Sequence, residues 1–478
     1  MGVLGQSGIS FNDTLRPFGP GGDGFAKVIE DSNSYYALSF LNSTVGQYPY
    51  LLELDNYGSI LNEKMYIDTN YNYAIYPYNS MVLKDSVLLF CGQTWNDSIG
   101  NLGFVFAINK YTLDTLWTKT YTHPDTLIAQ TAQDVFSVLT AIKPTPGGGY
   151  ILTGNYNKDC ITGNLRSFLM KIDSVGNVEW RRTYDNFYTF FDIEVAPDSG
   201  YYVPSTYNGN DIYLTKFDKN GAFEWKIQSN SNSYDSYPAD ISILDNQNVV
   251  ISSTFWYDVV NYKRAITVTK INMISKTVVW ENNYFPYYNF KCVSMHQAMG
   301  VEILPGGDII VSGTAKNYGH DAVILKLNSN GDSLWCKSYD FDPDPYDCQL
   351  NDLIITDDGG FMGVGFFSDQ SGPGWTAWMF KTDANGTIGF ENPKFEGSGI
   401  KVFPNPAHDY TIIELPENLK NPAELKVYNS HGQLVFQKSL NNGEKAIKLA
   451  LQGFDKGIYF FEIMGGGGVW GSSRFVKQ

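Results

Sequence analysis

The sequence predicts an all-β protein, a seven-bladed β-propeller followed by a small antiparallel β-sandwich. The first observation behind this prediction is a repeat. Residues Leu325–Tyr339 form an apolar run, a tight turn that closes on Gly331 and a second run that carries Trp335. The same spacing of Asp or Asn, Gly and Trp returns at 172–180 and 217–225, and looser copies bring the number of units to seven. The second observation is a composition of 33 Tyr, 30 Phe and 46 Gly with only 18% charged residues, which is typical of turn-rich β structure.

The third observation is the length of 478 residues, which is too great for one ordinary compact domain unless that domain adds repeated units around an axis. Each unit should hold several short strands, because Asp or Asn followed by Gly supplies the self-bonding side chain and the positive φ that a hairpin turn needs. The apolar strand Ala322–Leu327 looks buried on both faces, as in a blade stacked between two neighbours. The propeller is predicted over residues 1–392, with units at about 22–66, 77–121, 134–184, 189–228, 237–284, 293–339 and 350–390, and with an N-terminal strand at 10–18 that closes the ring on the seventh blade.

Two residue types recur at fixed positions in these units. The tryptophan of the last strand is expected to pack between blades, because a cofactor-binding residue would not be copied into many units. A lysine interrupts the third strand in five units, at Lys171, Lys216, Lys270, Lys326 and Lys381. We expect its stem to be packed and its amine to reach the blade rim or an acidic partner, which is a structural role.

Charge, cysteine content and hydropathy exclude several classes of partner. The net charge is −16, and residues 400–478 hold nine Lys or Arg against seven Asp or Glu, so the first 399 residues carry −18. Such a surface disfavours nucleic acid and anionic lipid. No apolar run approaches the roughly 18 residues of a transmembrane segment. The five cysteines form no metal-ligand pattern, and one disulfide among Cys292, Cys336 and Cys348 is compatible with their spacing.

No catalytic motif is found, so the sequence predicts neither an enzyme nor a cofactor. Function is expected in the loops that join one blade to the next, since these vary most between units. Aromatic and acidic side chains gather in these loops, and the candidate ligand face consists of Tyr73, Tyr76, Tyr188, Tyr287, Tyr288, Asp342 and Asp344. Aromatic rings could stack on sugars or hold a peptide, and the clustered carboxylates could hold Ca²⁺, whereas the simpler interpretation is that the tyrosines only pack the loops.

Three functions remain open at this point. The leading hypothesis is a non-enzymatic module that binds a glycan, a protein or a peptide. The alternative is a polysaccharide-degrading enzyme, a lyase or a glycosidase, with its acid and base on the loop face; carboxyl pairs roughly 5 to 10 Å apart would favour it. A passive surface component without a ligand is the third.

The C-terminal part of the chain has a different pattern. Residues 393–399 have the composition of a linker, and residues 400–478 alternate apolar with polar positions in short segments, which indicates a small antiparallel sandwich. This module starts with Val402-Phe403-Pro404-Asn405-Pro406 and ends with Phe475-Val476-Lys477, and it carries Val427–Val435 around Gly432 and then Gly457-Ile458-Tyr459-Phe460. On composition alone, it could also be an adhesive or carbohydrate-binding sandwich.

These segments resemble the type A sorting domain of cargo proteins of the type IX secretion system of Bacteroidota. The matching sorting-signal residues are Pro404, Asn405, Pro406, Gly432, Gly457, Tyr459 and Lys477. The resemblance implies a secreted or surface-attached protein that the type IX machinery of the outer membrane recognises. It also implies a cleaved N-terminal signal; Met1–Gly8 lacks the basic and full apolar regions of one, so this signal is expected to be missing or truncated here.

Overall fold

The computed structural model consists of two compact units, Met1–Ile388 and Gly389–Gln478, and its regular structure is all β-strand. Some strand residues, Tyr188 among them, are described by their backbone alone. The structure describes residues 11–15, 24–32, 34–43, 46–68, 70–76, 79–96, 98, 100–122, 136–157, 165–207, 211–229, 234–258, 263–284, 295–316, 320–339, 347–368, 375–388, 400–415, 423–429, 434–465 and 468–478.

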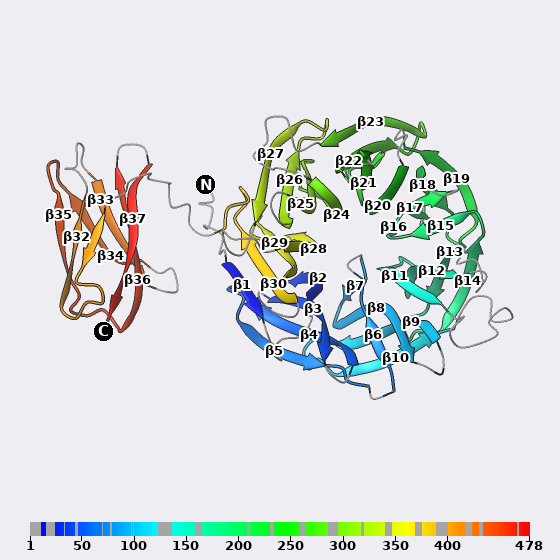
Figure 1. The fold of residues 1–478 in the computed structure, drawn as a ribbon, viewed down its shortest axis with the longest axis horizontal. Coiled ribbons are helices and arrows are strands. Elements are labelled where there is room, and N and C mark those ends of the chain that lie inside the picture. Colours follow the sequence, from blue (N-terminus) through cyan, green and yellow to red (C-terminus); the bar gives the residue numbers. More distant parts are fainter. Residues whose placement is uncertain are drawn as a thin grey trace. The chain divides into compact units, whose positions relative to one another are not determined.

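The described residues of the first unit form seven antiparallel sheets around a central axis, with β2, β7, β11, β16, β20, β24 and β28 innermost (Figure 1). We number the sheets as blades in chain order. Blade 1 holds β2 (Gly24–Asp31), β3 (Ser34–Ser43), β4 (Gly46–Asp55) and β5 (Ile60–Met65). Blade 2 holds β6 (Asn72–Ala74), β7 (Met81–Lys84), β8 (Val87–Asn96), β9 (Gly100–Asn109) and β10 (Thr115–Tyr121). Blade 3 holds β11 (Ser137–Pro144), β12 (Tyr150–Asn157), β13 (Leu165–Ile172) and β14 (Val178–Tyr184).

The remaining blades continue the same arrangement. Blade 4 holds β15 (Phe187–Phe190), β16 (Glu194–Val195), β17 (Tyr201–Tyr207), β18 (Asp211–Phe217) and β19 (Phe223–Gln228). Blade 5 holds β20 (Tyr234–Ile243), β21 (Asn248–Asp258), β22 (Lys263–Asn272) and β23 (Thr277–Tyr284). Blade 6 holds β24 (Met295–Ile303), β25 (Ile309–Lys316), β26 (His320–Leu327) and β27 (Ser333–Tyr339). Blade 7 holds β28 (Asp347–Ile355), β29 (Phe361–Ser368), β30 (Trp375–Thr382) and β1 (Phe11–Leu15).

Blade 7 therefore takes its outermost strand from the start of the chain. Strand β1 pairs antiparallel with β30, and Phe11 lies opposite Lys381. In blade 6 the residue opposite the equivalent Lys326 is Trp335, so Phe11 occupies the position of the repeated tryptophan. The segment that precedes blade 1 thereby completes the sheet of blade 7, which links the start of the propeller to its last blade and covers the edge of β30.

The tryptophan of an outer strand packs on the turn glycine of the next blade, as the repeat predicts. A Cβ atom added to Gly221 in blade 4 would lie 2.8 Å from the Trp180 ring of blade 3. Only glycine leaves room for the ring there, and its φ of +77° is also one that other residues rarely adopt. The same contact joins Trp117 to Gly176, Trp280 to Gly331 and Trp335 to Gly386.

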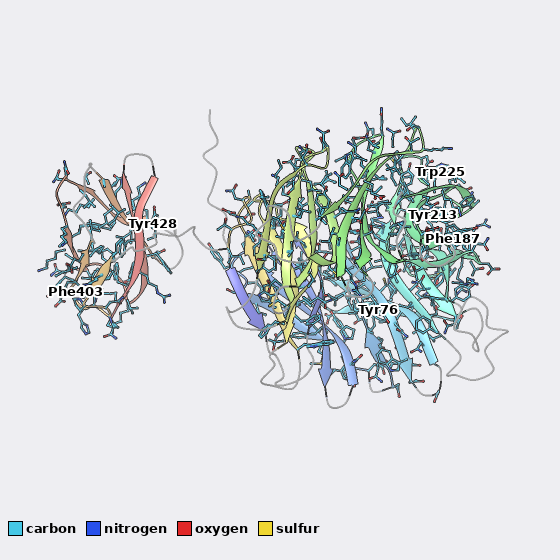
Figure 2. All side chains as sticks on the ribbon, turned by 45° about the horizontal axis from the view of Figure 1, so that its top comes forward. Tyr76, Phe187, Tyr213, Trp225, Phe403 and Tyr428 are labelled. Carbon is cyan, nitrogen blue, oxygen red and sulfur yellow. The ribbon has the colours of Figure 1, made fainter. Side chains whose placement is uncertain are left out.

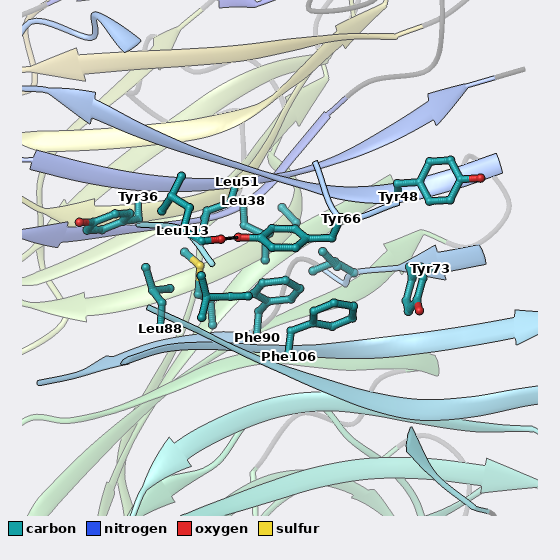
Figure 3. Packing of buried hydrophobic residues seen from close by; sticks show 14 of the residues in the cluster. Tyr36, Leu38, Tyr48, Leu51, Tyr66, Tyr73, Leu88, Phe90, Phe106 and Leu113 are labelled. Atoms are coloured by element: carbon teal, nitrogen blue, oxygen red, sulfur yellow. Dashed lines mark hydrogen bonds between the residues drawn. The ribbon is translucent and has the colours of Figure 1, made fainter. Parts of the chain in front are cut away.

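A tyrosine reinforces many of these junctions. Its hydroxyl donates a hydrogen bond to a carbonyl in the turn of the following blade, and Figure 3 shows Tyr66 bonded in this way to Leu113 at 2.9 Å. This pair lies in the apolar cluster between blades 1 and 2. The other four described pairs are Tyr121 with Gly176, Tyr184 with Gly221, Tyr284 with Gly331, and Tyr339 with Gly386.

The repeated lysines have the structural role that the sequence indicates. Their stems are packed inside the blade: the side chain of Lys216 is 3% exposed and that of Lys381 is 2% exposed. Four of the amines pair with carboxylates, Lys171 with Glu179, Lys216 with Asp198 and Glu224, Lys326 with Asp308, and Lys381 with Asp358. Lys270 instead donates to the carbonyl of Ser329 in the next blade at 3.2 Å.

The second unit is a sandwich of two antiparallel sheets. One sheet orders β31 (Lys401–Phe403), β32 (Tyr410–Glu414) and β35 (Ala446–Ala450). The other orders β34 (Leu434–Leu440), β33 (Ala423–Asn429), β36 (Gly457–Gly465) and β37 (Gly468–Lys477). Their inner faces enclose a core that includes Ile413, Val427, Ile447, Phe461 and Phe475. The all-β fold, propeller-type followed by a sandwich, is confirmed.

We predict that Gly221→Ala destabilises the propeller more than Gly307→Ala, by about 1–3 kcal/mol, because the added methyl overpacks against Trp180. Gly307 is a matched control, since it has a similar φ of +84° but nothing within 4 Å of an added Cβ. Both changes incur the same backbone strain, so the difference isolates the contact between blades. Urea unfolding followed by tryptophan fluorescence measures it, and equal losses would contradict the packing account.

Candidate functional site

The structure places the expected ligand-face tyrosines in different environments. Tyr73 is only 6% exposed, packs edge-on against Phe104 at 5.1 Å and donates its hydroxyl to Asp68. This corrects the expectation for Tyr73: its ring fills the core between blades 1 and 2 and presents no face to a ligand. Tyr76 is half-buried and donates to Gln93 Oε1 at 2.6 Å. Tyr287, Tyr288, Asp342, Asp344 and the side chain of Tyr188 lie outside the described residues.

A different aromatic cluster lies on blade 4, and we call it the blade-4 notch: Phe187, Tyr207, Tyr213, Phe223 and Lys226. Strand pairing brings it together, because Phe187 lies opposite Tyr207 and the hairpin of β17 and β18 sets Tyr207 and Tyr213 on one face. The ring centres of Phe187 and Tyr207 are 5.3 Å apart, and those of Tyr207 and Tyr213 are 5.5 Å apart. Figure 2 shows Phe187 and Tyr213 on this side of the ring.

Lys226 of β19 extends its ammonium into this notch. Its Nζ atom lies 2.8 Å from the centre of the Tyr207 ring and 4.5 Å from that of Tyr213. Within the described part of the chain, no carboxylate lies within ion-pair distance of Lys226. The aromatic faces stabilise the cation through their quadrupoles, but all three N–H groups of an ammonium can also donate to oxygen atoms.

The rim of the notch is polar and open to solvent. Phe223 is 49% exposed, and the exposed Gln228 lies opposite Tyr213 in the sheet. Burial, together with Asp211 and Tyr207, raises the pKa of Tyr213, so its hydroxyl stays protonated and donates to Gln228 Oε1 at 3.2 Å. Half-exposed rings beside an ammonium and an amide can stack on a sugar ring and hydrogen-bond its hydroxyls. None of these groups is a nucleophile prepared for catalysis.

Sequence reasoning singled out the neighbourhood of Phe187 but missed Tyr207, Tyr213 and Lys226, which are strand residues. A partial signal was present: Asn208-Gly209 is a hairpin turn sequence, which brings Tyr207 and Tyr213 onto neighbouring strands. Their shared face depends on the register, because the structure pairs Tyr207 with Asp211, and Tyr213, two residues further on, lies on the same face. Lys226 could not be assigned, because nothing local indicates that its stem bends over those rings.

Charged residues also line the ring axis, and their first role is to join blades. Asp352 of blade 7 accepts the backbone N–H of Val28 in blade 1 at 2.9 Å and pairs with Lys27 at 2.6 Å. Asp240 of blade 5 likewise accepts the N–H of Val301 in blade 6 at 2.9 Å. Sequence analysis missed this pattern, although an Asp before an apolar residue recurs at Asp192-Ile193, Asp240-Ile241 and Asp352-Leu353.

Glu302 is an axial group whose chemistry differs from that of a surface carboxylate. Burial raises the pKa of Glu302 to about 7, and the attraction of Lys27 and Lys143 offsets this only in part. A carboxyl group that titrates near neutrality can serve as a general acid or base. It lies on the ring axis and does not belong to the blade-4 notch.

The described part of the chain contains no group of three or more His, Cys, Asp or Glu residues with a geometry for a metal ion. No helix in that part has the length and apolarity to span a membrane. Cys91 is a buried free thiol, and Cys336 is disulfide-bonded.

In the C-terminal unit, the two ends of the sorting motif meet. Asn405 accepts a hydrogen bond from the N–H of Val476 at 2.9 Å and donates to the carbonyl of Arg474 at 3.2 Å. The Pro404 and Pro406 peptide bonds are cis. Lys477 pairs with Gly457 across the sheet, and Tyr459 stacks on Phe475 with ring centres 5.4 Å apart. Gly432 lies outside the described residues.

The comparisons with known proteins divide along the same boundary. Residues 401–478 match the family described as the secretion system C-terminal sorting domain. The funoran endo-beta-hydrolase of Wenyingzhuangia aestuarii is 35% identical over 80 residues, which are 16% of this chain and 10% of that protein. The chain therefore spans about a tenth of the length of the curated relative that it matches.

Similar solved structures are remote. The WD40 domain of Neurospora crassa Pan2 is 10% identical, with a TM-score of 0.47 over 80% of this chain and 97% of that one. The polysaccharide lyase Uly1 is 10% identical, with a TM-score of 0.44 over 80% of this chain and 94% of that one. A protein of unknown function from Bacteroides caccae is 12% identical, with a TM-score of 0.38 over 67% and 94%. Similarities this weak carry no functional argument.

Proposed function

We propose that the propeller of this protein, whose residues 401–478 are a type IX secretion sorting domain, binds a glycan through the blade-4 notch and catalyses no reaction on it. The sorting domain directs export to the cell surface or the medium and implies contact with the secretion machinery. The observation that carries the proposal is Lys226, whose ammonium lies among aromatic rings at a solvent-open edge with no carboxylate partner in the described residues.

The chemistry of the notch favours a sugar over the other ligands. Tyr213 and Phe223 offer ring faces for stacking, while Lys226 and Gln228 offer donors for ring hydroxyls. The net charge of −18 over the first 399 residues discriminates against long polyanions, so the proposed ligand is a neutral or sparsely charged glycan. Proteins and peptides are the other classes of ligand that the test distinguishes.

We expect Asn405→Ala to reduce export, because the variant loses both hydrogen bonds between the Asn405 side chain and β37. Each exposed bond contributes about 1 kcal/mol or less, so the sandwich should still fold. The measurement is the ratio of secreted and surface-bound protein to periplasmic protein. Asn441→Ala, in a turn of the same unit, is the control. If Asn405→Ala left export unchanged, the secretion machinery would not depend on the contact between Asn405 and β37.

We expect Tyr213→Ala and Lys226→Ala each to weaken glycan binding at least about tenfold, equal to ~1.4 kcal/mol. A glycan array with the full chain identifies a ligand, and calorimetry then compares the variants. Lys448→Ala is the matched control, because Lys448 makes a similar cation–π contact with Tyr410 at 4.2 Å in the other unit. Binding that both notch variants retain, or binding of peptides and no glycan, would contradict the proposal.

A polysaccharide-degrading enzyme is the second candidate, and the raised pKa of Glu302 is the observation that favours it. On our proposal the full chain releases no new reducing or unsaturated sugar ends from any glycan that it binds. Suppose that the wild-type protein releases such ends, and that Glu302→Gln abolishes the release while binding persists. The protein is then an enzyme, and the proposal of a non-catalytic binding module is wrong. Glycan binding without product, in both proteins, is the result we expect.

A further inference from the structure

Asp192 carries a buried oxygen atom whose hydrogen-bond donor is not among the described N–H and O–H groups. The residue lies between β15 and β16 and is 0% exposed. Its Oδ2 atom accepts the backbone N–H of Ile241 in blade 5 at 3.2 Å, whereas its Oδ1 atom is buried and has no described partner. An ionised carboxylate left in this state is costly, so a donor of some kind is required.

Asp240 lies beside Asp192, since both carboxyl groups accept the backbone N–H of Ile241. It is also the most connected carboxyl group of the ring axis. Its Oδ1 atom accepts the N–H of Ile241 at 2.9 Å and Asn79 Nδ2 of blade 2 at 3.0 Å, and its Oδ2 atom accepts the N–H of Val301 in blade 6. Two ionised carboxylates cannot hydrogen-bond to each other, because neither has a proton to donate.

Among the described residues, the two lysines that face this pair are engaged with other carboxylates. Lys143 of β11 pairs with Glu194 of β16 at 2.5 Å, and Lys27 of β2 pairs with Asp352 of β28 at 2.6 Å. Both amines thus bond to other carboxylates, and the fifth axial carboxyl group, Glu302 of β24, adds further negative charge. Five carboxyl groups therefore face two lysines around the axis.

We propose that Asp192 and Asp240 share one proton, with Asp240 as the carboxylic acid that donates to Asp192 Oδ1, and that this bond is a pH-sensitive link between blades 4 and 5. Through Asn79 and Val301 the same acid is also tied to blades 2 and 6. Burial raises the pKa of Asp240 well above its ordinary value, and the negative charge of Asp192 raises it further. The proton resides on Asp240, which donates it in the hydrogen bond to Asp192.

The link lies at a junction where the rim contact differs from that of its neighbours. Ser229 stands four residues after Trp225, where the other junctions with a repeated tryptophan have the tyrosine that bonds the next blade. The following turn in blade 5 holds Lys276 at positive φ in place of glycine, and its amine lies 5.5 Å from the Trp225 ring. The phenol–carbonyl bond is not made at this junction. The axial pair therefore contributes a larger part of the interaction between blades 4 and 5.

The sign of the pH effect follows from the direction of the shift. A carboxyl group whose pKa is raised by folding contributes stability that is fully present below its unfolded value and is lost as pH rises through its folded value. The raised pKa values of Glu302 and Glu194 act in the same direction. Wild-type protein should therefore unfold at a lower temperature at pH 8 than at pH 5, by about 3–5 °C.

Asp192→Asn is the decisive variant. It replaces the unpartnered oxygen by an amide that donates to ionised Asp240, so the link no longer needs a proton. The difference in Tm between pH 5 and pH 8 should therefore shrink by the part that the link contributes, while the parts from Glu302 and Glu194 remain. Asp352→Asn removes the same charge from the axis but breaks the pair with Lys27, so it should lower Tm at every pH and keep the wild-type slope. An unchanged slope in Asp192→Asn would overturn the proposal.

A second measurement holds even if a variant fails to fold. The infrared spectrum of the wild-type chain at pH 8 should contain a protonated carboxyl band that shifts in D₂O. Glu302→Gln should retain this band, and Asp240→Asn should lose it. A wild-type spectrum without such a band would mean that the pair is ionised and the proposal is wrong. Glycan binding does not enter this test, so its outcome is independent of the proposed function.

Discussion

The contact between the tryptophan of one blade and the turn glycine of the next is the constraint on which the ring depends. A single four-stranded sheet cannot bury both of its faces, and it does so here only by stacking on two neighbours. Trp180 occupies the space that a side chain at position 221 would fill, and the hydroxyl of Tyr184 bonds the same turn. The repeated Asp-x-x-Gly and Trp therefore contact each other between units and not within one.

The rim and the axis of the ring obey different rules. At the rim each junction is far from the others, so the same contact can be used repeatedly. At the axis the innermost strands converge, and identical charges there would repel one another. The residue that follows the bulge of the innermost strand accordingly varies among Lys27, Ala141, Asp240, Gly300 and Asp352. This variation lets lysines and carboxyl groups pair across blades, and it accompanies the raised pKa values of Glu194, Asp240 and Glu302 at the centre.

The two units of the chain divide its tasks. In the sandwich, Asn405 joins the first segment of the sorting motif to the last strand, so residues far apart in sequence form one structural feature. In the propeller, the notch beside Tyr213 lies on a blade whose inner strand is divided into β15 and β16. Each unit has its own core. Substitutions in the sorting domain therefore need not affect the proposed ligand site, and the reverse also holds.

The sequence by itself determined the fold class, the propeller-type repeat and the nature of the C-terminal module. These follow from turn chemistry and alternation, which are local properties that each segment carries with it. It also indicated the roles of the repeated Trp and Lys, because a residue copied from unit to unit serves the unit. Only the tertiary structure decided that Tyr73 is buried, that Lys226 lies over Tyr207 and Tyr213, and that Asp192 meets Asp240. Each of these contacts depends on distances between strands or blades. Those distances are set when the ring closes, and no local sequence pattern encodes them.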